Sequence, residues 1–237
     1  MTNSEFSNEF DILYNNIMSN QAPGLDAYEK SVFLTKAQED IVLAYYTGRN
    51  ESGDYFEGSE EVRQYLYTLI HDIEGDLMSD VPPKGISDDS KFYYLDERYL
   101  FILSEYIKTS AGKKIKVVPV TSDEFLKIEN NPFRGPSKSR VLRLDATTPT
   151  GGRMQELVTN ETISIYKARV LLKPAPIIIG TKEVKEGGKT YKTLEDGLTI
   201  DGNHINNECE LPDSLHRKIL DRAVLLAKAS FASNPGQ

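Results

Sequence analysis

The 237-residue sequence lacks tryptophan and contains a single cysteine, Cys209, and only three histidines. One cysteine can form neither an intrachain disulfide nor a thiolate metal cluster, so we expect the chain to fold in a reducing cytoplasm. The longest uncharged apolar run, residues 174–180, is far shorter than the ~20 residues of a membrane helix. The first residues show neither a basic n-region nor an apolar h-region, and no secretory signal is predicted.

Positive charge is also scarce, with 28 Lys and Arg against 36 Asp and Glu and a net charge of −8 at pH 7. A general nucleic-acid-binding protein needs a basic footprint to displace counterions, so this balance argues against that class. Hydrophobic residues at 39% and charged residues at 27% are typical of a globular chain. The length fits one large domain or two small ones.

Patterns that carry catalysis or metal binding are few. The sequence contains no G-x-S-x-G elbow, phosphate-binding loop or H-E-x-x-H motif. His71 and Glu74 would share one face of a helix and could bind a divalent ion, although a solvated face is the more ordinary explanation. His204 and Cys209 could form a nucleophilic pair only if the fold joins them, and a buried thiol is more usual. We therefore predict no catalytic residue, no cofactor and no metal site.

Helical spacing dominates the first eighty residues. Four residues with the side chain of an N-cap precede apolar stripes: Ser4, Asp26, Thr35 and Ser59. Asp26 and Thr35 also have a capping-box partner three residues on, which predicts two separate helices, from Asp26 to about residue 33 and from Thr35 onward. The helix after Ser59 is predicted to continue to Ile73, because its apolar stripe extends that far.

Branched and aromatic residues dominate the chain after residue 83. Six segments have the composition of strands: residues 92–95, 99–107, 114–120, 141–144, 162–166 and 169–172. The first two are predicted to form a hairpin, or a strand followed by a helix. Residues 177–179 are expected to be strand-like, and Gly187-Gly188 to form a hairpin tip or a loop. Thr121 opens a short capped helix, and residues 211–214 begin a final helix.

This order of elements predicts an α+β fold. We expect a helical body, formed by the N-terminal helices and the C-terminal helix, with an inserted β-rich sheet region. The chain is expected to be one structural subunit over residues 1–237, helical in 1–80, β-rich in 90–200 and closed by a helix at 210–231. The helices over Tyr28–Tyr46 and Val62–Ile73 should contact the final helix, Leu215–Phe231, and the strands between Phe92 and Ile179 should form a separate sheet.

Candidate contact residues lie in a loop at residues 130–136, where two prolines flank Phe133 and Arg134. Phe and Arg are enriched in the cores of protein interfaces, so this is either a docking loop or a turn with Phe133 in the core. Five basic residues lie nearby, on a phosphate-contacting loop or a solvated face: Lys127, Arg134, Lys138, Arg140 and Arg143. Polar loops at 48–58 and 147–159 are further candidates. The predicted interaction residues are Phe133, Arg134, Arg140 and Arg153.

Three parts of the sequence resemble a structural protein family of crAss-like phages that infect Bacteroidales. They are residues 9–17 with 22–38, residues 121–136 with their Asn-Pro-Phe loop, and residues 166–179 with 210–224. The third part, with a Lys-Pro-Ala-Pro turn before Leu-Pro-Asp-Ser-Leu-His, is more loosely similar to the head-to-tail adaptor proteins of short-tailed phages.

The resemblance implies a subunit of an oligomeric ring, expected to be dodecameric, in the head-to-tail connector beneath the portal. Such a ring would form part of the DNA channel and link the capsid to the tail. The implied partners are further copies, the portal protein, an adjacent neck or tail ring protein, and DNA that passes without sequence-specific binding; no membrane is involved. The protein would be made in the bacterial host cytoplasm and located in the neck or tail of the virion.

The resemblance implies no catalytic residue and no cofactor. Three alternatives stay open at this point. The chain could be a lower neck ring, tail-completion or gatekeeper protein of the same virion. It could be a carboxylate-based hydrolase, because adjacent acidic pairs such as Glu60-Glu61 are abundant. It could be a nucleic-acid-binding regulator, which the charge balance opposes.

Overall fold

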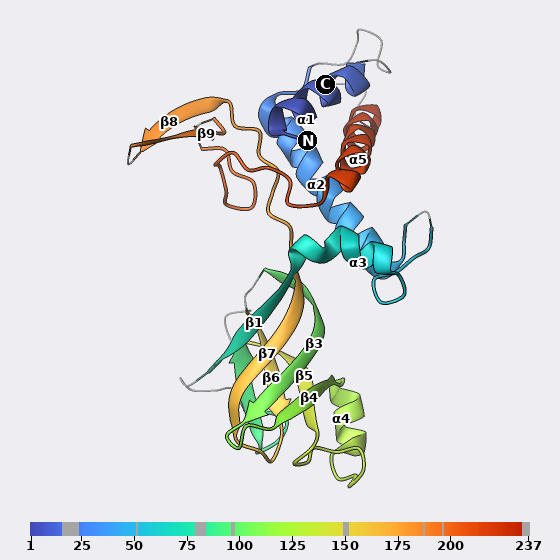
Figure 1. Ribbon diagram of the computed structural model, residues 1–237, viewed down its shortest axis with the longest axis vertical. Helices are drawn as coiled ribbons and strands as arrows, with labels where there is room; N and C mark the ends of the chain where they lie inside the picture. The colour runs from blue at the N-terminus through green and yellow to red at the C-terminus, as the bar shows by residue number, and fades with distance from the viewer. Residues whose placement is uncertain are drawn as a thin grey trace. The chain divides into compact units, whose positions relative to one another are not determined.

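The computed structural model describes residues 1–15, 24–50, 52–78, 84–95, 98–148, 152–186, 188–195 and 197–233. The chain forms two compact units, which we call the helical unit (Met1–Leu69 with Pro174–Gln237) and the barrel unit (Ile70–Lys173). Helices at both ends of the chain and strands between them confirm the α+β prediction (Figure 1). The units divide after Leu69 and after Lys173, whereas the sequence suggested changes of character near residues 80–90 and 200–210. None of the described helices is long and apolar enough to cross a membrane.

The helical unit is built around three helices that lie side by side: α1 (Asn3–Asn15), α2 (Ala27–Thr47) and α5 (Asp213–Ser233) (Figure 1). The predicted contact between the helix over residues 28–46 and the final helix is confirmed by α2 and α5, and α1 packs on α5 as well. Phe6 and Phe10 of α1 are fully buried, and the ring of Phe6 lies 5.4 Å from that of His216 on α5. Burial of such aromatic faces provides most of the stability of a helical body of this kind.

Two of the predicted N-caps are wrong, Ser4 because a local pair caps the helix two residues earlier and Thr35 because it bonds to a distant part of the chain. Thr2, not Ser4, begins α1: the Thr2 amide donates to Glu5 Oε2 (2.7 Å) and the Glu5 amide to Thr2 Oγ1 (3.3 Å). Asp26 does form a capping box with Glu29. Thr35, however, lies in the middle of the continuous helix α2 and is buried.

The third helix is shorter than predicted. Helix α3 (Glu60–Leu66), capped by Ser59, is followed by the 3₁₀ turn η1 (Tyr67–Leu69) and then by strand β1 (Ile70–Leu77). The prediction of a helix through Ile73 is therefore wrong. Pairing of β1 with a neighbouring strand outweighs the local helical spacing, and Gly75 allows the close approach: a Cβ there would lie 2.5 Å from Cδ1 of Tyr166.

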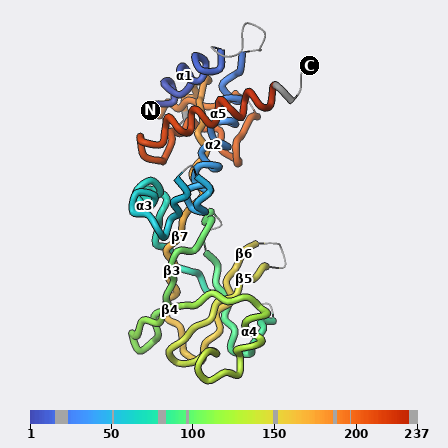
Figure 2. The backbone as a smooth tube through the Cα atoms, turned by 90° about the vertical axis from the view of Figure 1, so that its right-hand side faces the viewer, coloured from blue at the N-terminus to red at the C-terminus, as the bar shows by residue number. Residues whose placement is uncertain are grey.

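Seven strands close into a barrel in the order β1-β2-β6-β5-β4-β3-β7. After β1 they are β2 (Ser90–Tyr94), β3 (Tyr99–Thr109), β4 (Lys114–Pro119), β5 (Val141–Thr147), β6 (Arg153–Val158) and β7 (Ile163–Leu172). All neighbours are antiparallel except β4 and β5, which helix α4 (Ser122–Ile128) connects in parallel (Figure 2). Phe125 and Ile128 of α4 pack on Leu142, Leu144 and Val158. Closure removes the unpaired edges that an open sheet would expose.

Several strand predictions need correction. Strands β2 and β3 do not form a hairpin, since β2 pairs with β1 and β6 while β3 pairs with β4 and β7. Residues 162–166 and 169–172 belong to the single strand β7. Residues 147–159 are not a polar contact loop, because they contain β6, which is buried from Met154 to Val158. The polar residue Glu156 is buried within it, where its side chain accepts from the amide of Ile86 (2.6 Å) and from the hydroxyl of Ser90.

The chain returns to the helical unit through a buried extended segment, residues 174–180. Ile177, Ile178 and Ile179 are buried, and a single bridge joins Ile178 to Asn207. On the other side, three side chains of α2 take the place of a neighbouring strand. Ser31 Oγ accepts from the amide of Ile179 (2.9 Å), Thr35 Oγ1 accepts from the amide of Ile177 (3.1 Å), and Gln38 Nε2 donates to the carbonyl of Ala175 (2.8 Å). These α2 residues form what we call the polar ladder.

The segment leads into a two-stranded hairpin of β8 (Lys182–Glu186) and β9 (Lys189–Thr193), which lies apart from α1, α2 and α5 in Figure 1. This confirms the prediction of a hairpin; Gly188 at its turn has a φ of 79°, and Gly187 lies outside the described residues. Its base is fixed by close backbone approach, since a Cβ on Gly180 would lie 2.7 Å from the carbonyl carbon of Lys192.

Candidate functional site

The loop after α4 presents Phe133 to solvent with 83% of its surface exposed. The loop is rigid: Asn131 Oδ1 accepts from the amides of Phe133 (2.9 Å) and Arg134 (3.1 Å). Gly135 packs so closely that a Cβ would lie 2.6 Å from the carbonyl oxygen of Glu129. Of the two hypotheses for Phe133, burial in the core is wrong. An exposed aromatic side chain on a hydrogen-bonded loop is a suitable anchor for another protein.

Basic side chains surround this aromatic. Arg140 Nη1 donates to the carbonyl oxygen of Phe133, and Arg134 and Lys138 are exposed in the same loop. Residues 127–140 contain one acidic residue, Glu129, and four basic residues: Lys127, Arg134, Lys138 and Arg140. Their net charge is therefore +3. We call residues 127–140 the Phe133 loop. The structure thus brings together three of the four predicted interaction residues.

The fourth, Arg153, lies elsewhere on the barrel. It begins β6, its guanidinium donates to the carbonyl oxygen of Tyr99 (2.9 Å), and it stacks 4.1 Å from the centre of the Tyr99 ring. The sequence grouped Arg143 with the exposed basic residues, which is wrong, because Arg143 is buried in the barrel.

The barrel interior holds a polar cluster around Glu105. Its carboxylate accepts from Arg143 Nε (2.8 Å) and from the hydroxyl of Tyr166 (2.7 Å). Burial alone would lower the pKa of Arg143, but the charge and hydrogen bond of Glu105, together with Asp145 and Tyr166, outweigh burial and the pKa is raised. Burial, with the charge of Glu105, raises the pKa of Tyr166. These groups satisfy one another, so the cluster links strands rather than offering reactive groups.

Because tyrosines are buried in the barrel, we expect the barrel to lose stability at alkaline pH. Burial raises the pKa of Tyr93 to about 12, whereas a tyrosine in the unfolded chain ionises near ~10. The stabilisation is therefore complete below pH ~10 and is lost as the pH rises through about 12. In urea unfolding at pH 8, 10 and 11, Tyr93→Phe should lose less stability than the parent chain. Equal losses in the two chains would show that Tyr93 is not a cause.

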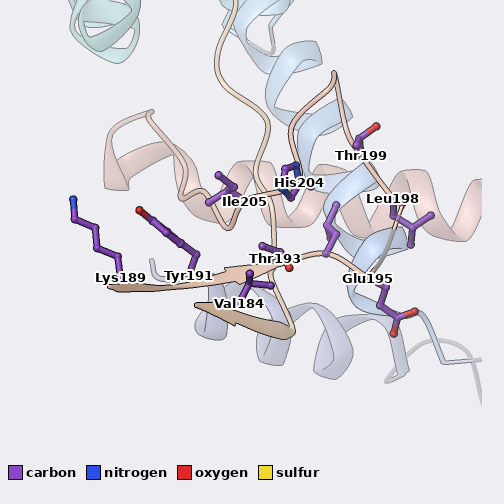
Figure 3. A pocket seen from close by; sticks show the side chains of 11 residues that line it. Val184, Lys189, Tyr191, Thr193, Glu195, Leu198, Thr199, His204 and Ile205 are labelled. Carbon is purple, nitrogen blue, oxygen red and sulfur yellow. The ribbon is translucent and has the colours of Figure 1, made fainter. Parts of the chain in front are cut away.

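A cavity of about 720 Å³ opens between the β8–β9 hairpin and the segment that follows it (Figure 3). The hairpin contributes a cross-strand pair, Val184 and Tyr191, and the segment contributes Leu198 and Ile205, the last 49% exposed. The other face of the hairpin is polar: Glu183, Lys185, Thr190 and Lys192. The hairpin therefore turns Val184 and Tyr191, with Lys189 and Thr193 on the same face, toward this cavity, which we call the hairpin cavity.

The segment that follows the hairpin is acidic in sequence, and the described lining of the cavity holds one acidic residue, Glu195, and one basic residue, Lys189. Residues 194–210 contain five acidic residues and no Lys or Arg: Glu195, Asp196, Asp201, Glu208 and Glu210. The same contrast holds for the units. The helical unit has 21 acidic and 12 basic residues, a net charge of −9, and the barrel unit has 15 acidic and 16 basic residues, a net charge of +1. The two values sum to the −8 of the chain.

The structure does not support the chemistry suggested by the sequence for His71 with Glu74 or for Cys209. His71 and Glu74 lie in strand β1, where residues three apart point to opposite faces, so the shared helical face was wrong. Among the described residues, no group of three or more His, Cys, Asp or Glu could hold a metal ion. Cys209 Sγ donates to Gln38 Oε1 (3.1 Å), and burial raises the pKa of its thiol to about 11. The Cys209 thiol is thus protonated at neutral pH, and a thiol in that state is a poor nucleophile.

Comparison with known proteins places the chain among phage structural proteins, in keeping with a surface whose described features suit protein contacts. The chain belongs to the family described as "Phage tail ring protein 3/4", whose sequence model matches residues 1–237. It is 38% identical over 233 residues to "Ring protein 4/5" of Bacteroides phage crAss001, covering 98% of this chain and 94% of the relative. It is 39% identical over 236 residues to "Ring protein 3" of the same phage, covering 96% and 95%. The family resemblance seen in the sequence is confirmed.

Proposed function

We propose that this chain is a virion structural subunit that assembles into a closed ring in the head-to-tail connector, below the portal. The ring forms part of the DNA channel and links the capsid to the tail. The observation that carries this proposal is the match of the whole chain to a family of phage ring proteins. The exposed Phe133 supports it, because an aromatic anchor on a hydrogen-bonded loop suits a contact between subunits.

The proposed partners follow from the same assembly. A cyclic ring, here proposed to be a dodecamer, needs two complementary surfaces on each copy. Its other contacts are the portal protein and an adjacent neck or tail ring, and DNA passes without sequence-specific binding. A net charge of −8 supports this role, because cations facing a channel would add salt-dependent affinity for phosphate. The role is structural, not enzymatic, and its place is the virion neck after synthesis in the host cytoplasm.

A lower ring, away from the portal, is the second candidate. It is favoured by the family description, which names a tail ring, and by two relatives named for different rings. The identities of 38% and 39% do not separate those relatives. Under this candidate, which extends to a tail-completion or gatekeeper role, the chain docks on another ring and not on the portal.

Electron microscopy of the purified chain mixed with the portal assembly of its phage tests both candidates. A symmetric ring added beneath the portal is the result expected for the connector. Rings that form without binding the portal would favour the lower ring. If no ring forms with the portal or with a second ring protein, both candidates are wrong.

Phe133, Arg134 and Arg140 are the proposed contact residues of one surface, and Arg153 is proposed to contact a partner separately. Phe133→Ala should weaken ring assembly at least ~10-fold, because truncation of an interface anchor costs more than about 1.4 kcal/mol. The melting temperature of the unassembled chain should not change, since Phe133 is exposed. Leu126→Ala, which truncates another exposed apolar side chain, on α4, is the matched control. Sedimentation measures the assembly of both variants. Equal assembly of the two variants would remove Phe133 from the interface.

A further inference from the structure

We propose that the Phe133 loop of one copy inserts into the hairpin cavity of the next copy around the ring. This inference rests on the proposed function and names the two surfaces that the ring uses. The occupant of the cavity is thus a second copy of this same chain.

The apolar parts match. Phe133 is 83% exposed and stands on a loop whose backbone is already fixed. The hairpin cavity has Val184 and Tyr191 on one wall and Leu198 and Ile205 on the other (Figure 3). Its volume of about 720 Å³ lies within the roughly 300–1,000 Å³ of pockets that enclose a drug-sized ligand, so it can admit a phenyl ring with its neighbours. Burying this ring would remove apolar surface from water on both partners.

The charges match as well. The Phe133 loop has a net charge of +3, with Arg134 next to the aromatic. The segment after the hairpin has five acidic residues and no basic one; of these Glu195 lines the cavity, where Lys189 of β9 is the basic residue of the lining. Opposite charge around an apolar contact favours the correct partner and speeds the encounter. The units repeat this relation, at +1 for the barrel unit and −9 for the helical unit.

The symmetry is that of a ring. The loop belongs to the barrel unit and the cavity to the helical unit, so each copy offers one of each. A contact between unlike surfaces is heterologous, and its repetition closes a ring when the rotation allows. A contact of either surface with itself would stop at a dimer. The amphipathic hairpin gains a covered apolar face, which an isolated two-stranded sheet needs for stability.

Thiol cross-linking between two tagged variants tests the contact. One full-length variant carries Arg134→Cys, beside the intact Phe133, and the other carries Ile205→Cys at the cavity. Each is added at low fraction to excess parent chain, so that ring formation does not depend on the substitutions. The native Cys209 contributes little background, because its thiol is largely shielded and its pKa is about 11. A short bis-maleimide is then applied to rings verified by electron microscopy, with and without the portal assembly.

The expected product is a heterodimer of the two variants, at least tenfold more abundant than either homodimer. Leu225→Cys, at an exposed residue of α5, replaces Ile205→Cys in the matched control and should give no such product. Rings in which the heterodimer is absent, or no more abundant than in the control, overturn the loop-in-cavity contact and leave the ring assignment intact. Failure of the parent chain to form rings under every condition overturns the proposed function and this inference with it.

Discussion

Replacing Arg143 with methionine is expected to lower the free energy of unfolding by about 3–5 kcal/mol. Arg143 and Glu105 are both buried, and their side chains meet at 2.8 Å inside the barrel. Methionine retains the apolar stem but leaves the buried carboxylate of Glu105 without its charged partner and, among the described residues, with the hydroxyl of Tyr166 as its donor. Urea unfolding measures the loss. Arg153→Met, at an exposed residue of the same barrel, is the control and should cost no more than about 1 kcal/mol.

A second substitution separates the charge from the packing. The double variant Arg143→Met with Glu105→Gln removes both charges. The amide oxygen of the introduced glutamine can still accept from the hydroxyl of Tyr166. A neutral replacement of a buried pair is often tolerated, so most of the lost stability should return. If the single variant costs as little as Arg153→Met, the ion pair does not stabilise the barrel. If the double variant is no better than the single one, packing around Arg143 and not its charge is the cause.

This ion pair also bears on function, because of its place in the chain. Arg143 lies on β5, directly after the Phe133 loop, and Glu105 lies on β3. The loop and α4 together form the crossover between the parallel strands β4 and β5. An anchor at the start of β5 holds one end of that crossover. Loss of Arg143 should therefore loosen the loop that presents Phe133 as well as destabilise the barrel.

Local signals in the sequence predicted the elements that local forces determine. Asp26, Ser59 and Thr121 cap helices as predicted, because an N-cap needs only a side chain and an amide two or three residues on. Thr35 has the same local pattern but bonds to Ile177, 142 residues away. Strand β6 was missed for a similar reason, since its Gln155 and Glu156 are polar and find partners inside the fold.

The Phe133 loop and the hairpin cavity also differ in how far the sequence alone could predict them. Phe133 could be singled out from the sequence because prolines flank it, but only the structure shows that it is exposed. The hairpin cavity was not predicted, because it needs β8, β9 and the segment after them together. A signal was present: Val184 and Tyr191 each stand between polar residues at matching distances from Gly187-Gly188. A hairpin centred on those glycines places the two side chains opposite each other, as the structure does.

Removal of the polar ladder is expected to have the second large effect on stability. The double variant Ser31→Ala with Thr35→Val should lower the free energy of unfolding by about 2–6 kcal/mol, because each lost acceptor leaves a buried amide unpaired at about 1–3 kcal/mol. The amides concerned are those of Ile179 and Ile177, which donate to these hydroxyls at 2.9 and 3.1 Å. Valine matches threonine in shape, so the loss reports the hydrogen bonds more than the packing.

The same helix offers the control. Thr47 also has a bonded hydroxyl, which donates to the carbonyl of Leu43 at 2.7 Å, but it is exposed. Thr47→Val should change stability by no more than about 0.5 kcal/mol.

Hydrogen exchange gives a second measurement: the amides of Ile177 and Ile179 should exchange faster in the double variant, with α5 unchanged. Because residues 174–180 lead directly into β8, release of this segment should also free the base of the hairpin and weaken ring assembly. Stability and exchange equal to those of Thr47→Val would show that other groups satisfy these amides and that the ladder does not hold the segment.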